Sequence, residues 1–156
     1  MSKSMNTYLE YARQISKILT NKMKAVGNKH KLTKMEAHAL LFFSVDSHEP
    51  IASEFCKCGS YPKSNVSKAL LNLSKRNFIT MESREGDRRY QEVKLTEEGL
   101  EVAKEIRAEI DPILAKLSKG LDPKDKQVLY SAMNTLKQNI DDMMIELFDE
   151  KNKEKL

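Results

Sequence analysis

Apolar residues recur every three or four positions over most of this chain, which is the spacing of amphipathic helices. The stretch from Tyr8 to Val26 has such a stripe and predicts a first helix that ends at Gly27. In the following segment "LTKMEAHALLFFSV", Thr33 and Glu36 have the spacing of a capping box. This segment therefore predicts a second helix, rich enough in apolar residues to be largely buried.

Two shorter helical patterns follow. The segment "EPIASEFCKCG" predicts a third helix that opens at Pro50. Its shared face consists of Ile51, Phe55 and Cys58. The segment "PKSNVSKALLNLSKRNF" predicts a fourth helix with one apolar face, formed by Val66, Ala69, Leu70 and Leu73. The remaining side chains of its first turns then point outward and form a basic face rich in hydrogen-bonding groups, namely Lys63, Ser64, Asn65, Ser67 and Lys68.

The period then changes from helical to alternating. The segments "FITMES" and "RYQEVKL" are short, contain β-branched and aromatic residues, and predict two strands. The intervening "REGD" is a turn sequence, so the two strands form a hairpin. Helical periodicity returns from Thr96 to Lys119, with a bend at Pro112 and an end at Gly120. Asp122 and the proline after it then predict the start of a last helix.

The predicted order is four helices, a hairpin and two helices, with neither an internal repeat nor a linker. We therefore expect a mainly α (α+β) fold in a single domain over residues 1–156. Two short helices followed by a hairpin is the order of a winged helix-turn-helix, predicted over about residues 31–96. In that arrangement the second helix of the pair enters the major groove of DNA and the hairpin reaches the flanking backbone or minor groove.

The composition indicates a folded protein and its cellular compartment. The chain of 156 residues is 40% hydrophobic and 32% charged, as expected of a folded, helix-rich protein. It has neither an apolar run long enough to span a bilayer nor an apolar signal-peptide core at its start, so we expect a cytoplasmic protein without a membrane partner. Two cysteines so close together, Cys56 and Cys58, fit a reducing compartment.

The distribution of charge indicates the partner. Residues 57–94 hold nine Lys or Arg against four Asp or Glu, whereas the rest of the chain has a net charge of about minus one. There is no Asp or Glu from Cys56 through Met81. A positive surplus confined to one segment is typical of a protein that binds a polyanion, and double-stranded DNA is the leading candidate.

The chain resembles the MarR family of bacterial winged-helix transcription regulators over nearly its whole length. The family carries D-R-R at the wing tip and L-T-x-x-G at the next helix, as in Asp87-Arg88-Arg89 and Leu95-Thr96-x-x-Gly99 here. "LTKMEAHALL" and "SNVSKALLNLSKRNFI" resemble the entry to its second helix and its recognition helix. Three features differ from the family pattern: "KCGSYPK" is one residue longer than the usual loop, Leu71 replaces a polar residue, and Arg84 replaces an acidic one.

The resemblance implies DNA contacts from the recognition helix and the wing. Asn65 could pair with adenine, Lys63 and Lys68 could contact bases or phosphates, and Arg89 is the first choice for insertion into the minor groove. The full set of expected DNA-binding residues is Ser60, Lys63, Ser64, Asn65, Ser67, Lys68, Arg84, Asp87, Arg88 and Arg89.

The resemblance also implies a homodimer that reads a pseudo-palindromic operator, with dimerisation helices at about residues 4–27 and 97–150. Their apolar stripes are longer than a small winged domain can bury. By the same resemblance the protein is a repressor that releases DNA when a small anionic or aromatic effector binds between the dimer helices and the DNA-binding lobe. The candidate pocket residues are Tyr8, Tyr11, Met35, His38, Phe42 and Ile106.

Other readings stay open. Lys57 between Cys56 and Cys58 could lower a thiol pKa, which would suit a redox-sensing variant, while burial of Cys58 in the core is the simpler alternative. A winged-helix module that binds protein instead of DNA is a further alternative. The histidines, Glu36 and the cysteines have no recognised metal-ligand spacing, and catalytic motifs are absent, so we expect no metal, cofactor or enzymatic activity.

Overall fold

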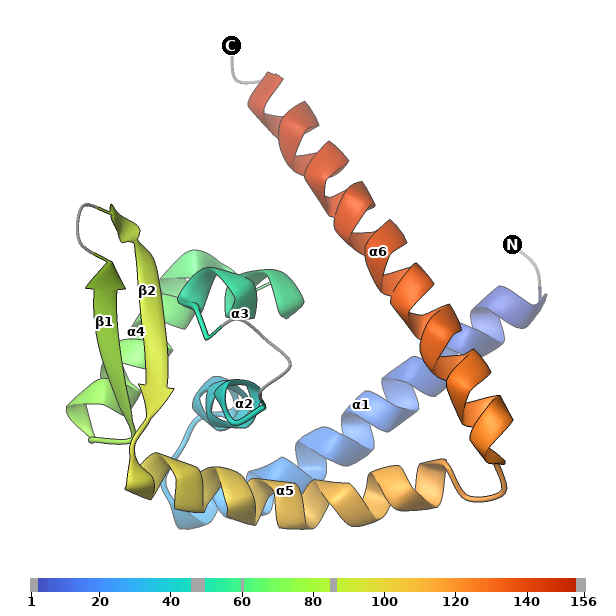
Figure 1. The fold of residues 1–156 in the computed structure, drawn as a ribbon, viewed down its shortest axis with the longest axis horizontal. Coiled ribbons are helices and arrows are strands. Elements are labelled where there is room, and N and C mark those ends of the chain that lie inside the picture. Colours follow the sequence, from blue (N-terminus) through green and yellow to red (C-terminus); the bar gives the residue numbers. More distant parts are fainter. Residues whose placement is uncertain (1–2, 46–49, 60, 85–86, 154–156) are drawn as a thin grey trace. The chain divides into compact units, whose positions relative to one another are not determined.

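The computed structural model describes residues 3–45, 50–59, 61–84 and 87–153 (Figure 1). Six helices and two strands lie in this part of the chain: α1 (Lys3–Lys29), α2 (Lys34–Phe43), α3 (Ala52–Cys58), α4 (Lys63–Lys75), β1 (Ile79–Arg84), β2 (Asp87–Leu95), α5 (Glu97–Leu117) and α6 (Pro123–Lys153). The chain forms two compact units, residues 1–114 and 115–156. The predicted order of elements is confirmed.

The first helix does not end at Gly27 as predicted. α1 continues through Gly27 to Lys29, and Lys31 then adopts the left-handed conformation with φ 52°. The amides of Lys31 and Leu32 donate to the carbonyls of Asn28 at 3.2 Å and Gly27 at 2.7 Å. This pair of bonds is a Schellman motif, in which Lys31 occupies the position that glycine usually fills.

The predicted capping box opens α2. The Thr33 side chain accepts from the Glu36 amide at 3.2 Å, and Glu36 Oε2 accepts from the Thr33 amide at 2.7 Å. Glu36 is buried, and its other carboxylate oxygen accepts a 3.2 Å hydrogen bond from the Asn72 amide group of α4, which offsets the cost of burying a polar group. One carboxylate therefore caps α2 and ties it to α4.

The third helix starts later than predicted. α3 begins at Ala52 after Ile51, whereas the Pro50 carbonyl accepts a 2.6 Å hydrogen bond from the Val93 amide of β2. Ile51 also forms an isolated antiparallel bridge with Glu92. Pro50 and Ile51 thus hold the wing against the helical part of the first unit, a pairing that the sequence did not predict.

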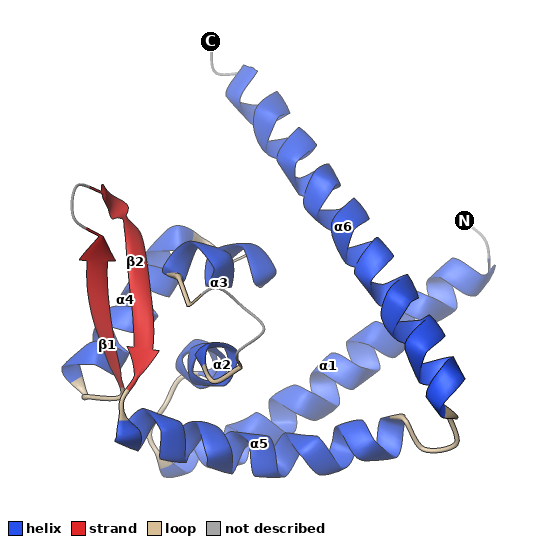
Figure 2. Ribbon diagram, viewed as in Figure 1, coloured by secondary structure: helices blue, strands red, loops and turns tan. Residues whose placement is uncertain are grey.

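The predicted hairpin is confirmed (Figure 2). β1 and β2 are antiparallel, with Ile79 opposite Leu95 and Met81 opposite Val93, and the register shifts near the tip between Ser83 and Arg84. The two residues between the strands, 85 and 86, lie outside the described residues. Ile79 and Val93 are buried, whereas Met81 and Leu95 are partly buried and pack against the core.

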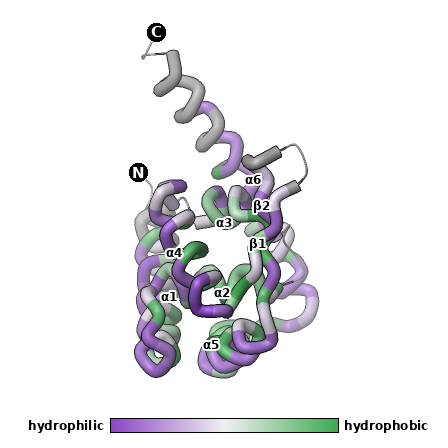
Figure 3. The backbone as a smooth tube through the Cα atoms, turned by 90° about the vertical axis from the view of Figure 1, so that its left-hand side faces the viewer, coloured by the Kyte–Doolittle hydropathy of each residue, from purple (hydrophilic) through white to green (hydrophobic). Residues whose placement is uncertain are grey.

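The core of the first unit lies among α2, α3, α4, the hairpin and the facing parts of α1 and α5. Figure 3 shows green, hydrophobic stretches of α2 and α4 in its interior. Its largest fully buried side chains are Phe55, Leu40, Leu70, Leu73, Ile79, Ile106, Val66 and Val93. The four apolar positions predicted for the inner face of α4 are all buried.

The long helices keep much of their apolar surface exposed. α5 buries Ala103, Ile106 and Ile110 but exposes Leu100, Leu114 and Leu117, and it ends at Leu117, three residues before Gly120. Asp122 caps α6 as predicted, since its Oδ1 accepts from the Asp125 amide at 2.8 Å. The exposed apolar residues of α6 are Val128, Leu129, Tyr130, Met133, Leu136, Ile140 and Met143.

Candidate nucleic-acid interface

The outward face of α4 carries the predicted base-reading residues. Val66, Ala69, Leu70 and Leu73 point into the core, which leaves the opposite side of the helix in solvent. There the structure exposes Lys63, Ser64, Asn65, Ser67 and Lys68. The last expected member, Ser60, lies outside the described residues. α4 has no acidic residue, so its exposed surface is uniformly positive or neutral.

The lysines of this face are available to a ligand. Within the described part of the chain, neither Lys63 nor Lys68 forms an ion pair, whereas Lys57 pairs with Glu54 at 2.7 Å and Lys94 pairs with Glu82 at 3.0 Å. An ammonium group without a carboxylate partner can bind phosphate without first giving up an ion pair. Phosphate binding by such groups releases counterions from DNA and accounts for much of its affinity.

Tyr61 positions the start of α4. Its amide donates to the Cys56 carbonyl at 2.9 Å, and its hydroxyl forms a hydrogen bond with Nδ1 of His38 in α2. Its ring lies so close to Gly59 that a Cβ at that position would be 2.1 Å from a ring carbon. Tyr61 therefore ties the turn before the recognition helix to α2. Sequence reasoning missed this residue, although it lies in the loop that is longer than usual.

Burial governs the ionisation of this pair. Loss of solvent lowers the pKa of His38, and the nearby Lys34 lowers it further. Burial also raises the pKa of the Tyr61 hydroxyl. Both groups are therefore held neutral at neutral pH, and His38 packs edge-on against the rings of Phe55 and Tyr61.

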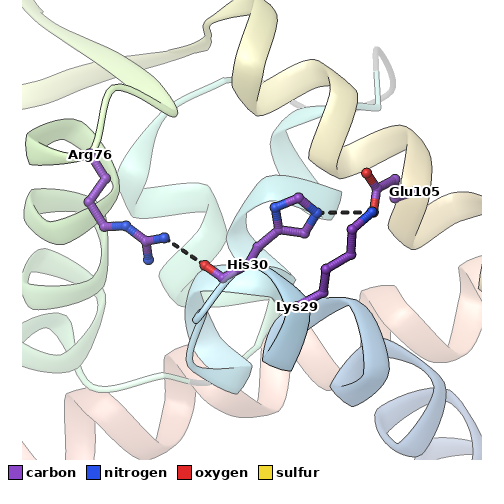
Figure 4. Close-up of polar contacts among 4 residues, drawn as sticks. All are labelled: Lys29, His30, Arg76 and Glu105. Atoms are coloured by element: carbon purple, nitrogen blue, oxygen red, sulfur yellow. Dashed lines mark hydrogen bonds and ion pairs between the residues drawn. The ribbon is translucent and has the colours of Figure 1, made fainter.

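A polar network fixes the other end of α4 (Figure 4). The guanidinium of Arg76 donates to the carbonyls of His30 at 2.6 Å and Lys31 at 3.0 Å, and it lies 4.9 Å from the ring centre of Phe78. Glu105 of α5 binds Lys29 at 2.8 Å and His30 at 3.0 Å, and Lys29, followed by His30, lowers the pKa of this carboxyl group. The end of α4 is thus anchored to the residues that follow α1 and, through His30, to α5.

The wing residues lie at the far end of the hairpin. Arg84 ends β1 and Asp87 begins β2, and the backbones of Arg88 and Arg89 continue β2. The side chains of these four residues lie outside the described part of the structure. Further down the hairpin, Lys94 bridges Glu82 and Glu92, and its hydrogen bond with Glu82 is the main reason why its pKa is raised.

The expected effector residues do not line one described cavity. Phe42 and Ile106 belong to the core, Met35 packs partly against it, and Tyr11 is exposed. The side chain of Tyr8 lies outside the described residues. The first unit instead has an open groove of about 510 Å³ along α1. Its lining is Leu9, Ala12, Arg13, Ser16, Lys17, Thr20, Asn21 and, from α2, Lys34.

The two cysteines exchange the positions predicted for them. Cys58 is exposed instead of facing the core with Phe55, whereas Cys56 is half-buried and packs against the core. Ile51 and Phe55 of the same predicted face are buried, but α3 ends at Cys58, so the helical spacing does not carry this side chain into the core. Burial raises the pKa of the Cys56 thiol, an effect that Lys63 only partly opposes. Groups of three or more metal-binding side chains are absent from the described residues.

Comparisons with known proteins agree with this geometry. Residues 32–99 match the family model "Winged helix DNA-binding domain". Two similar solved structures are a protein of Listeria monocytogenes described as a MarR-family transcriptional regulator and crystallised with a 26-mer DNA, and MepR of Staphylococcus aureus in its DNA-binding conformation. The Listeria protein is 19% identical to this chain, with a TM-score of 0.73, and the match covers 93% of each chain. MepR is 17% identical, with a TM-score of 0.74, and the match covers 85% of this chain and 98% of MepR.

The chain has the winged-helix fold of the MarR-family regulators. A MarR protein from Peptoclostridium difficile, at 18% identity and a TM-score of 0.70, covers 94% of this chain and 92% of its own. The MarR-like fold thus includes the long helices outside residues 32–99. None of the curated proteins matches the chain. Among the described helices, none has the length and apolarity needed to cross a membrane.

Proposed function

We propose that this protein is a MarR-family transcription regulator that binds double-stranded DNA in a sequence-specific manner. The observation that carries the proposal is the exposed face of α4, which is free of acidic residues and holds two lysines, Lys63 and Lys68, that form no ion pair with the described residues. Its fold is shared with a Listeria protein crystallised with DNA, which supports the same use of the helix here. DNA as a ligand also accounts for the charge surplus of residues 57–94.

The side chains of α4, of the preceding loop and of the wing have distinct proposed roles. Asn65 pairs with an adenine edge, and Lys63 and Lys68 contact guanine edges or phosphates. The hydroxyls of Ser60, Ser64 and Ser67 donate to phosphate oxygens. Arg84, Arg88 and Arg89 carry the wing's positive charge to the flanking backbone, with Arg89 in the minor groove and Asp87 orienting one of the arginines.

We propose that the regulator works as a homodimer. The large apolar side chains that α1, α5 and α6 expose to solvent support this proposal, because exposed apolar surface often marks a site of protein association. Two-fold pairing would cover them and place two α4 helices about one turn of DNA apart. Light scattering should give twice the chain mass of 17.9 kDa. Ile140→Glu should shift the protein toward monomer, while Asn139→Glu, at a neighbouring exposed polar position, should not.

The direction of regulation follows from the family resemblance. We propose a cytoplasmic repressor that leaves its operator when a small effector binds and changes the spacing of the two recognition helices. The open groove along α1, with Arg13, Lys17 and Lys34 on its rim, offers positive charge to an anionic effector. Tyr8, Tyr11, Met35, His38, Phe42 and Ile106 remain the residues that the resemblance suggests for the pocket.

Selection of bound sequences from a random pool of DNA duplexes tests the proposal. We expect enrichment of a pseudo-palindrome with half-sites about 10 base pairs apart. Repeating the selection with phenolic acids should reduce the bound fraction if such an effector acts on the protein. Failure to enrich any sequence, in a protein shown to be folded and dimeric, would instead favour a winged-helix module that binds another protein.

A further inference from the structure

Leu71 is exposed at the centre of the outward face of α4. Leu71 is 48% exposed. The other apolar residues of α4, namely Val66, Ala69, Leu70 and Leu73, are buried. Leu71 follows Ser64 by seven residues and Lys68 by three, so it lies on the same side of the helix as both. It thus belongs to the surface proposed to enter the major groove.

The surroundings of Leu71 point to one kind of occupant. Lys68 and Lys75 lie three residues before it and four after it, both exposed, and α4 contains no acidic residue. An apolar side chain between two ammonium groups suits a surface that is anionic at its edges and apolar in the middle. The major groove of DNA has this character, since phosphates border it and the 5-methyl group of thymine is the apolar group on its floor.

We propose that Leu71 is a specificity-determining residue that contacts a thymine methyl group in each half-site. This inference rests on the DNA-binding function proposed above. Leu71 cannot donate or accept a hydrogen bond, so it favours thymine through apolar contact alone. Six residues along α4 separate it from Asn65, a rise of about 9 Å at 1.5 Å per residue. At about 100° per residue the two side chains also lie about 120° apart around α4, so Leu71 should meet a different base pair from the one read by Asn65.

Replacement of thymine by deoxyuridine, which removes only the methyl group, tests the inference directly. Each thymine of the selected duplex is replaced in turn, together with its symmetry mate. We expect one pair of positions at which the dissociation constant of the wild-type protein rises about fourfold per half-site, the equivalent of one buried methyl group at about 0.8 kcal/mol. Leu71→Ala should bind the thymine and deoxyuridine duplexes equally at those positions.

Ser53→Ala is the control, because Ser53 is exposed on α3 and belongs neither to the face proposed to bind DNA nor to the surface proposed to form the dimer. It should keep the full response to deoxyuridine. The inference is overturned if the wild-type protein tolerates deoxyuridine everywhere, if Leu71→Ala keeps the same response, or if Leu71→Ala alters self-association instead of base preference. Should the variant not fold, the scan with the wild-type protein still decides. Absence of any preferred duplex would be a different result, the failure of the proposed DNA-binding function.

Discussion

Gly99 lies against the carbonyl oxygen of Phe78, so close that a Cβ at Gly99 would be 2.0 Å from that oxygen. The same carbonyl accepts a 3.1 Å hydrogen bond from the Thr96 amide. The Thr96 hydroxyl in turn donates to the Asn77 carbonyl at 2.6 Å and accepts from the Gly99 amide at 3.1 Å. The start of α5 is thus joined to the turn that follows the recognition helix.

Gly99→Ala should destabilise the protein by about 3 kcal/mol, the upper range for overpacking a tight site. The methyl group would meet a backbone oxygen, which cannot move without breaking its bond to Thr96. Urea unfolding measures the change. Gly27→Ala is the control, because Gly27 lies within α1 with only ordinary contacts around it, and alanine there should add up to about 1 kcal/mol. Equal stability of Gly99→Ala and the wild-type protein would contradict the close approach.

The contact between Gly99 and the Phe78 carbonyl explains why the last position of the Leu95-Thr96-x-x-Gly99 pattern is a glycine. Leu95-Thr96-x-x-Gly99 indicated the start of α5 through its resemblance to the family pattern, and the structure shows that Thr96 caps the helix. The buried positions of α4 were predicted from the sequence itself, since periodicity alone decides which side of a helix faces the core. What meets Gly99 could not be predicted, because Phe78 reaches it only through the folded hairpin.

The errors of prediction arose where backbone hydrogen bonds, local or distant, override the apolar periodicity. Gly27 was expected to end α1, but the bonds of Leu32 and Lys31 place the left-handed residue at Lys31. Pro50 was expected to open α3, but its carbonyl pairs with β2. The hydrogen bond between His38 and Tyr61 spans 23 positions and leaves no periodic signal. This hydrogen bond nonetheless helps to position α4, the helix whose basic outward face the sequence predicted.

The stability of the protein should depend on pH through His38. Its pKa is lowered in the folded state, mainly by burial, from the value of 6.5 for an unperturbed histidine. The folded state therefore binds fewer protons than the unfolded chain, so this stabilising contribution is complete above about pH 6.5 and is lost as the pH falls through the lowered pKa. The positive charge of Lys34 is the second cause of the lowered pKa of His38, after burial.

Comparison of the wild-type protein with His38→Asn isolates this effect. Asparagine can still accept a hydrogen bond from Tyr61 but does not titrate. The difference in unfolding free energy between the two proteins should be constant above pH 7 and should shift against the wild type below about pH 6.5. Parallel pH profiles of the two proteins would show that His38 is not held neutral by the fold.

The two thiols should react at different rates. Cys58 is exposed, whereas Cys56 is half-buried with a raised thiol pKa, so iodoacetamide at pH 8 should label Cys58 first. Peptide mass spectrometry after short exposures measures the order of labelling. Faster labelling of Cys56 would contradict the placement of the two residues. If peroxide released DNA from the wild-type protein but not from a variant with both cysteines replaced by serine, the redox-sensing alternative would gain support.

Arg89→Ala should weaken binding to every DNA sequence. If the guanidinium neutralises phosphate charge in the minor groove, its removal reduces the slope of log K against log salt by about one for each protomer. Arg107→Ala, an exposed arginine on α5, should leave the slope unchanged. Fluorescence anisotropy at several salt concentrations provides both values. An unaltered slope in folded Arg89→Ala would remove Arg89 from the proposed interface.

The most direct test of the account compares affinity for the selected duplex with affinity for a scrambled duplex of the same composition. We expect the wild-type protein to prefer the selected duplex by at least about 1,000-fold at physiological salt. Asn65→Ala should lose affinity mainly for the selected duplex, because this side chain reads a base and the lysines around it bind phosphate. Equal affinities of the wild-type protein for the two duplexes would contradict sequence-specific recognition by α4.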